Sequence, residues 1–124
     1  MKNKWRNKNF FNALKNALNG MCYTIKNENN IKIQLVIAIV VIIMSIIFKI
    51  SIIEACIIII TIFFVLFAEF VNTAIEATVD LYTEEYNEKA KIAKDVAAAG
   101  VTLSAISSVI VGVLIFLPKI IKYL

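Results

Sequence analysis

Three long apolar segments dominate the sequence and restrict the chain to a membrane-spanning fold. Residues 33–48 and 96–117 carry no charged side chain, and residues 50–68 carry one. A helix needs roughly 20 apolar residues to cross the hydrocarbon core of a bilayer. The first segment reaches this length because Lys32 and Lys49 can extend their ammonium groups to the two interfaces. We therefore predict an all-α integral membrane protein.

The 124 residues fit a single membrane-embedded domain with three transmembrane helices. The predicted spans cover residues 31–50, 52–82 and 89–118, and Pro118 is expected to end the third. Lys49, Ile50 and Ser51 can form only a tight connection between the first two spans. The polar run TEEYNE (residues 83–88) is expected to be the loop between the second and the third.

The segment before the first span has the pattern of a helix that lies on the membrane surface, and we predict it over residues 8–28. Its apolar residues recur at helical spacing, with asparagine and lysine on the other side. They are Phe10, Phe11, Leu14, Ala17, Leu18, Met21 and Ile25. Such an amphipathic helix binds in the interface plane, and nearby basic residues are attracted to anionic lipid. Whether it does more than anchor the chain stays open.

The distribution of lysine and arginine predicts the orientation of the chain, because cytoplasmic loops carry an excess of these residues. Most of them precede the first span or follow the second, and these two groups must share one side of the membrane. They are Lys2, Lys4, Arg6, Lys8, Lys15, Lys26, Lys32, Lys89, Lys91 and Lys94. The other side holds only Lys49, Lys119 and Lys122. We predict a cytoplasmic N-terminus and an external C-terminus.

The composition excludes several kinds of active site. The sequence contains no histidine, which rules out a Ser-His-Asp triad, a histidine base and histidine-ligated zinc. Neither common glycine-rich phosphate motif is present. Cys22 and Cys56 are too few and too far apart to indicate a disulfide framework. Proton chemistry must therefore depend on carboxylates, lysines or tyrosines, and any metal site must be rich in oxygen ligands.

Polar residues gather at the end of the second apolar run, in AEFVNTAIEATVDL (residues 68–81). Relative to Glu69, a helix places Asn72 at about 300°, Glu76 at about 340° and Asp80 at about 20°. The four side chains therefore form one stripe. An ionised carboxylate in hydrocarbon is costly and indicates a functional site. The alternative is a structural seam in which polar groups join helices.

Three further charged side chains are expected at the same membrane depth: Glu28 before the first span, and Lys94 and Asp95 where the third begins. Carboxylates without histidine or cysteine favour Mg²⁺. Together with a lysine and a bilayer interface, they suggest phosphoryl transfer to a lipid alcohol, in which a carboxylate accepts the hydroxyl proton. Two other classes stay open on the residues alone: a small ion-coupled transporter and a non-catalytic membrane subunit.

The stripe also resembles a known signature. Residues 69–80 read EFVNTAIEATVD, which matches the pattern E-x-x-N-[ST]-A-I-E-x-x-V-D of the small bacterial diacylglycerol kinase family. Asn27-Glu28, Glu84-Glu85-Tyr86 and Ala93-Lys94-Asp95 match the same family in order and spacing. The pieces ISIIE, NTAIE, AKD and IFLPK resemble its Gram-positive branch, whose members are mainly undecaprenol kinases. The resemblance covers residues 10–117.

The resemblance implies a homotrimer in the bacterial cell membrane, with active sites shared between protomers at the cytoplasmic interface. Its substrate would be undecaprenol or, alternatively, diacylglycerol, with ATP as donor and Mg²⁺ as cofactor, and no nucleic-acid partner is expected. The resemblance makes Glu69 the general base and Glu28 and Glu76 the ligands of Mg²⁺–ATP. Lys94 and Asp95 would contact the nucleotide.

Other positions follow from the same resemblance. Asn72 and Asp80 would shape the site. Glu85, Asn87 and Asn16 occupy further nucleotide-binding positions, where the two asparagines depart from residues common in the family. Gln34 stands at a position associated with the lipid headgroup, which is often His or Glu.

Overall fold

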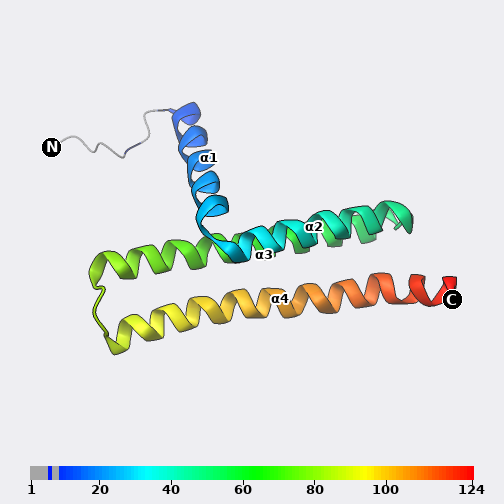
Figure 1. Ribbon diagram of the computed structural model, residues 1–124. Coiled ribbons are helices and arrows are strands. Elements are labelled where there is room, and N and C mark those ends of the chain that lie inside the picture. Colours follow the sequence, from blue (N-terminus) through cyan, green and yellow to red (C-terminus); the bar gives the residue numbers. More distant parts are fainter. Residues whose placement is uncertain (1–5, 7–8) are drawn as a thin grey trace.

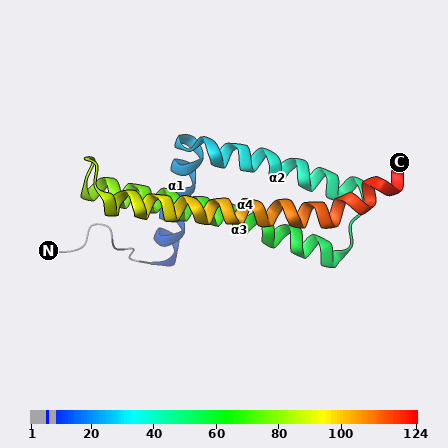
Figure 2. The same cartoon turned by 90° about the horizontal axis from the view of Figure 1, so that it is seen from below.

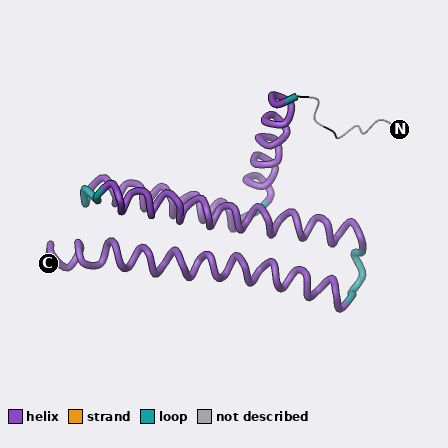
Figure 3. Tube along the Cα trace, turned by 180° about the vertical axis from the view of Figure 1, so that it is seen from behind, coloured by secondary structure: helices purple, strands orange, loops and turns teal. Residues whose placement is uncertain are grey.

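Four helices make up nearly all of the described chain, which comprises residue 6 and residues 9–124 of a computed structural model. They are α1 (Phe10–Asn27), α2 (Asn29–Ile47), α3 (Ile52–Tyr82) and α4 (Glu88–Tyr123), joined by short loops (Figures 1 and 3). No strand occurs among the described residues. Three of the helices are long and apolar enough to cross a membrane, as predicted. Lys2, Lys4 and Lys8, which were expected to lie near the lipid surface, are outside the described residues.

The chain changes direction sharply between α1 and α2. Glu28 has an extended backbone and is both the C-cap of α1 and the N-cap of α2. Its N–H still donates to the Thr24 carbonyl at 2.9 Å. This single residue suffices for the turn, so α2 begins at Asn29, earlier than the predicted span. As a result α1 projects away from the other three helices at a wide angle (Figure 1).

The connection between α2 and α3 is as tight as the sequence indicated. Lys49 adopts a left-handed backbone with φ of 49°. Ser51 then caps α3: its hydroxyl accepts from the Glu54 N–H at 3.1 Å, while the Glu54 carboxylate accepts from the Ser51 N–H at 3.0 Å. This reciprocal pair is a capping box, which satisfies N–H groups that a helix start leaves unpaired.

Pro118 does not end α4, contrary to the prediction, because the helix continues to Tyr123. A proline inside a helix removes one backbone hydrogen bond. Here the lost bond lies in the last turns, where Lys119 anchors the chain. The Lys119 ammonium donates to the Ile115 carbonyl at 3.4 Å and to the Glu54 carboxylate at 2.7 Å. These contacts stabilise the final segment against α3.

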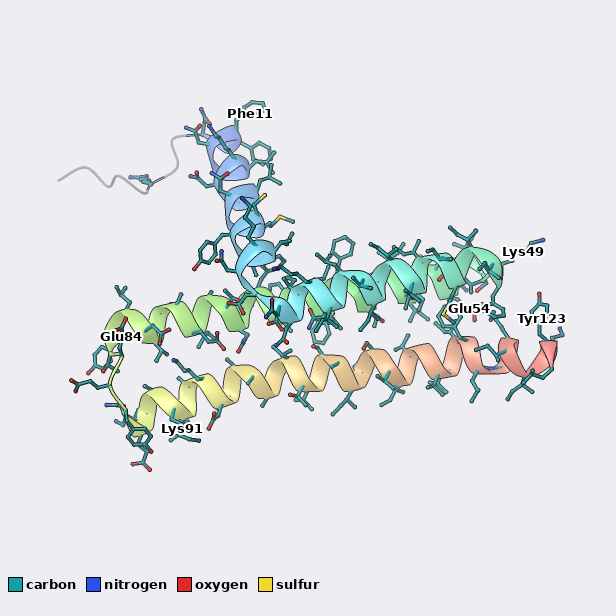
Figure 4. The ribbon with its side chains drawn as sticks, in the orientation of Figure 1. Phe11, Lys49, Glu54, Glu84, Lys91 and Tyr123 are labelled. Carbon is teal, nitrogen blue, oxygen red and sulfur yellow. The ribbon has the colours of Figure 1, made fainter. Side chains whose placement is uncertain are left out.

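Two ion pairs join α3 and α4, one near each end of the helix pair. Glu54 pairs with Lys119 at 2.7 Å near one end, and Asp80 pairs with Lys94 at 2.7 Å near the other. Between them, Ile58 packs in a small core with Ile115 and Phe116. Figure 4 shows Glu54 and Glu84 at opposite ends of this antiparallel pair. Figure 2 shows α4 crossing over α3 while α2 lies to one side.

The helices differ in length, and this difference locates the membrane boundary. With a rise of 1.5 Å per residue, α2 is about 28 Å long, which matches the hydrocarbon thickness of about 30 Å. The same rise gives about 46 Å for α3 and about 54 Å for α4. Both longer helices extend beyond the start of α2, at the end that carries the polar stripe (Figure 1). That end of α3 therefore continues past the hydrocarbon.

We predict that neutralising Glu54 lowers thermal stability, because Lys119 then loses its partner near hydrocarbon. Glu54→Gln keeps an oxygen that can accept in the capping box, so it isolates the ion pair. Its melting temperature in detergent, followed by circular dichroism, should fall. Adding Lys119→Met removes the unpaired charge and should restore most of the loss. Equal melting temperatures for the single variant and the unaltered chain would refute a stabilising role.

Candidate active site

Glu69 lies about 26 Å along α3 from its start, close to the far side of a hydrocarbon layer about 30 Å thick. Its side chain is only 1% exposed. Gln34, about one and a half turns into α2, donates from Nε2 to Glu69 Oε2 at 3.4 Å. The bond joins two helices at one depth. The second carboxylate oxygen, Oε1, is buried with no hydrogen-bond partner among the described residues.

The register of α3 and α4 explains how Glu69 becomes buried. Counting equal distances from the Glu54–Lys119 pair, Ser104 of α4 comes opposite Glu69. Ser104 is fully buried, and its hydroxyl donates to the Val101 carbonyl at 2.7 Å. A small side chain at this point lets the two helices approach closely. The carboxylate and the serine are thus both buried at the same level of the α3–α4 pair.

Unpaired polar atoms collect around Glu69. Asn72 and Thr73 follow it on the same face of α3 and are also buried. Four buried atoms lack a partner among the described residues: Gln34 Oε1, Glu69 Oε1, Asn72 Oδ1 and Thr73 Oγ1. Leaving a buried polar group unpaired costs about 1–3 kcal/mol, and native structures contain few of them. Their concentration on one short stretch of α3 and its partner in α2 is therefore typical of a binding site.

Three carboxylates come together at this place. Glu76 is half-buried and accepts from Asn72 Nδ2 at 3.2 Å. Glu28 is also half-buried, at the junction of α1 and α2. Both interact electrostatically with Glu69. The structure thus brings together the predicted base and the two predicted metal ligands, although they come from separate parts of the chain.

The donor set fits a magnesium–nucleotide complex better than a dedicated metal cage. No group of three or more acidic, cysteine or histidine side chains in the described residues is arranged to hold a metal ion. Mg²⁺ in phosphoryl-transfer sites is held by one or two carboxylates, with phosphate oxygens and waters as its other ligands. Glu28 and Glu76 can supply that pair. Glu76 accepts from Asn72 through Oε1, so its Oε2 can serve as a metal ligand.

Lys94 and Asp95 lie on α4 where it faces the extension of α3, but they have separate partners. Lys94 bonds to Asp80 at 2.7 Å and also interacts electrostatically with Glu76. Asp95 bonds to Lys91 at 2.6 Å. These side chains are exposed. Lys94 is therefore connected to the polar stripe, whereas Asp95 is turned toward its own helix.

Three predicted nucleotide residues do not join Glu69 within one chain. Asn87 caps α4, because its Oδ1 accepts from the Ala90 N–H at 3.1 Å. Glu85 is exposed in the loop before it. Asn16 is exposed on α1, about 18 Å along the helix from Glu28. Their roles remain predictions.

The structure adds residues that the sequence reasoning did not assign. Thr73 stands about 40° from Glu69 around α3, so the stripe itself could have identified it. The sequence identifies Gln34 only as a departure from the family pattern, at a position associated with the lipid headgroup, and the structure shows its bond to Glu69. Ser104 gave no signal in the sequence, because a serine in an apolar helix is unremarkable until the register with α3 is known.

The fold and the site define a helical protein with three helices long and apolar enough to span a membrane and a buried carboxylate centre. A sequence model of the family described as "Prokaryotic diacylglycerol kinase" matches residues 15–116. The chain belongs to this family, which confirms the resemblance. It is 41% identical over 111 residues to "Undecaprenol kinase" of Bacillus subtilis (strain 168), covering 90% of each chain. It is 34% identical over 123 residues to "Diacylglycerol kinase" of Synechocystis, covering 98% of this chain and 70% of the relative.

We predict that Asn87 serves mainly as a helix cap. Asn87→Ala should destabilise the protein by about 0.5–2 kcal/mol, whereas Asn87→Ser, which can also cap, should restore most of that stability. Chemical denaturation measures the stability of both variants. The KM for ATP in each variant tests whether Asn87 also binds the nucleotide. A nucleotide affinity that falls equally in both variants would show that the asparagine amide itself binds the nucleotide.

Proposed function

We propose that the protein transfers the γ-phosphoryl group of ATP to the hydroxyl of a membrane lipid alcohol. Undecaprenol is the first candidate and diacylglycerol the second, since the two relatives are named for these substrates. The observation that supports the proposal is the buried Glu69 carboxylate with one unpaired oxygen, placed at the depth where α3 leaves the hydrocarbon. A lipid hydroxyl lies at this depth while its tail stays in the bilayer.

Glu69 acts as the general base in this proposal. Its unpaired Oε1 accepts the proton of the lipid hydroxyl as the oxygen attacks the γ-phosphorus. Gln34 holds the other carboxylate oxygen, so the base has a defined orientation. Burial between α3 and α4 keeps bulk water away from the carboxylate, which protects the phosphoryl donor from hydrolysis.

The nucleotide end of the reaction depends on the carboxylates and the lysine. Glu28 and Glu76 would hold Mg²⁺, which neutralises phosphate charge when it is bound. Lys94 contacts phosphate oxygen as a point charge. Since Lys94 is paired with Asp80 at an exposed site, exchange of that partner for a phosphate costs little. Asp80 thus keeps the lysine directed toward the stripe until nucleotide binds.

The membrane arrangement belongs to the same proposal. The excess of basic residues around α1 and the α3–α4 loop supports a cytoplasmic N-terminus and an active site at the cytoplasmic interface of the cell membrane. Phe10, Phe11 and Leu14 of α1 are exposed, and the helix lies at a wide angle to α2, which suits a helix on the lipid surface (Figure 4). Family membership supports a homotrimer.

The test is an assay on the purified protein in lipid–detergent micelles with labelled ATP, Mg²⁺ and either undecaprenol or diacylglycerol. We expect labelled phospholipid from at least one of them, and the ratio of the two ranks the substrates. Absence of labelled lipid from both would refute the function. Ion flux in liposomes that depends on Glu69 would instead favour a transporter.

Replacement of Glu69 by glutamine should reduce turnover by roughly 10²- to 10⁴-fold, because the amide cannot accept the hydroxyl proton. The substitution removes a buried charge, so folding should be kept. Nucleotide binding, measured by calorimetry, should change little. Turnover within a few-fold of the unaltered chain would remove Glu69 as the base.

Glu76→Gln should weaken binding of magnesium nucleotide, because the site loses one of two anionic oxygen ligands. We expect a KM for Mg²⁺–ATP raised roughly tenfold and a higher Mg²⁺ requirement. Glu84→Gln is the matched control, since Glu84 is an exposed acid in the loop at the same end of α3 (Figure 4). The same loss in both variants would point to a general charge effect.

A further inference from the structure

A largely apolar groove runs from the candidate site toward the other end of the molecule. It has a volume of about 520 Å³ and is lined by all three long helices, including Gln34 and Val41 of α2, Ile58 and Leu66 of α3, and Gly112 and Phe116 of α4. Small-ligand sites have volumes of about 300–1,000 Å³. The groove exists because α2 and α4 both lie against α3 while their backbones stay apart.

Gln34 connects the groove to the base. Its side chain lines the groove and donates to Glu69 Oε2 at 3.4 Å. A hydroxyl at Glu69 can therefore belong to a molecule whose apolar part continues directly into the groove. The lining extends about 15 Å along α2 and about 22 Å along α4, long enough for only the first part of a long lipid tail. The remainder can leave sideways between α2 and α4.

The mouth of the groove offers hydrogen-bond acceptors. Gln34 directs its NH₂ group to the Glu69 carboxylate, because the opposite orientation would place oxygen against oxygen. Asn72 directs its NH₂ group to Glu76 for the same reason. Each amide is thus left with a buried carbonyl oxygen that, like Glu69 Oε1, has no partner among the described residues, and of these two amides Gln34 lines the groove. The carboxylates therefore determine which atoms the two amides present.

We propose that Gln34 is a specificity-determining residue that favours a polyprenol over a diacylglycerol, and that the first units of the prenyl tail occupy the groove. A prenol head carries one hydroxyl, which donates to Glu69, and no other polar atom. A diacylglycerol head also carries two ester carbonyls, which can only accept. Placing them beside Gln34 Oε1 and Glu69 Oε1, which cannot donate, leaves these acceptors unpaired, and a polar site discriminates strongly against such an arrangement. This inference rests on the lipid kinase activity proposed above.

The test compares kcat/KM for undecaprenol and for diacylglycerol in the full chain. Gln34→Met keeps an unbranched side chain but removes the acceptor and the donor. Turnover should fall on both lipids, because Glu69 loses its partner, while the ratio of diacylglycerol to undecaprenol efficiency should rise roughly tenfold. A purely structural role would leave that ratio unchanged.

Gly112 allows a second test of the groove. A Cβ added there meets no atom within 4 Å, so larger residues should fold. Gly112→Leu should raise the KM for undecaprenol several-fold without changing the KM for ATP, and Gly112→Ala should have a smaller effect. Leu114→Phe enlarges a side chain at an exposed position of α4 outside the groove and is the control.

The outcomes separate this inference from the function. If the unaltered protein phosphorylates neither lipid, the kinase function fails. If it phosphorylates them and Gln34→Met leaves their ratio unchanged, the specificity role of Gln34 is wrong. If Gly112→Leu leaves the lipid KM unchanged, the tail site is wrong. A change in the mass of the particle in light scattering would then show that the groove holds a neighbouring copy.

Discussion

The register between α3 and α4 is the constraint on which the site depends. The partly buried Glu54–Lys119 pair and the neighbouring Ile58 core hold the two helices together at one end, and the exposed Asp80–Lys94 pair adds a weaker contact at the other. Counted from the Glu54–Lys119 pair, this arrangement puts Ser104, a small residue, at the level of Glu69. A slip of one residue would rotate the contacting face by about 100° and put Leu103 or Ala105 in its place. Burial of the carboxylate is thus a consequence of contacts made well away from it.

That burial lowers stability locally. Glu69, Asn72 and Thr73 keep polar atoms unpaired in a place that apolar side chains could fill more favourably. The capping box at Ser51, the anchoring of Lys119 and the aromatic contact between Phe48 and Tyr123 stabilise the opposite end of the bundle. Structures commonly violate packing rules at functional sites and compensate elsewhere. Here the compensating contacts lie at the end of the helix bundle that contains no predicted site residue.

Much of the architecture could be predicted from the sequence because membrane helices follow hydrophobic length and charge distribution, which are both local. The stripe from Glu69 to Asp80 followed from helical periodicity alone. Pro118 misled the prediction, because a proline rule cannot show that Lys119 anchors the chain beyond it. The bond from Gln34 to Glu69 and the burial of Ser104 depend on how separate helices meet. The periodicity of a single segment does not determine how separate helices meet. The sequence could therefore predict Glu69 as the candidate base but not the residues that surround it.

The unequal helix lengths place two environments on one rigid element. From Ile52 to Ala68, α3 is apolar apart from Glu54 and one threonine and is long enough for most of a hydrocarbon layer. The segment from Asn72 to Asp80, about 12 Å long, has polar partners instead. A lipid alcohol and a nucleotide have opposite solubilities, so an enzyme that joins them needs groups for each on either side of one boundary. Gln34 and Asn72 illustrate this most directly. Each amide is oriented by a carboxylate, Gln34 by the one on the lipid side and Asn72 by the one on the nucleotide side. The same acidic stripe therefore orients both amides, and in the proposed reaction lipid selection and nucleotide binding would depend on one set of charges.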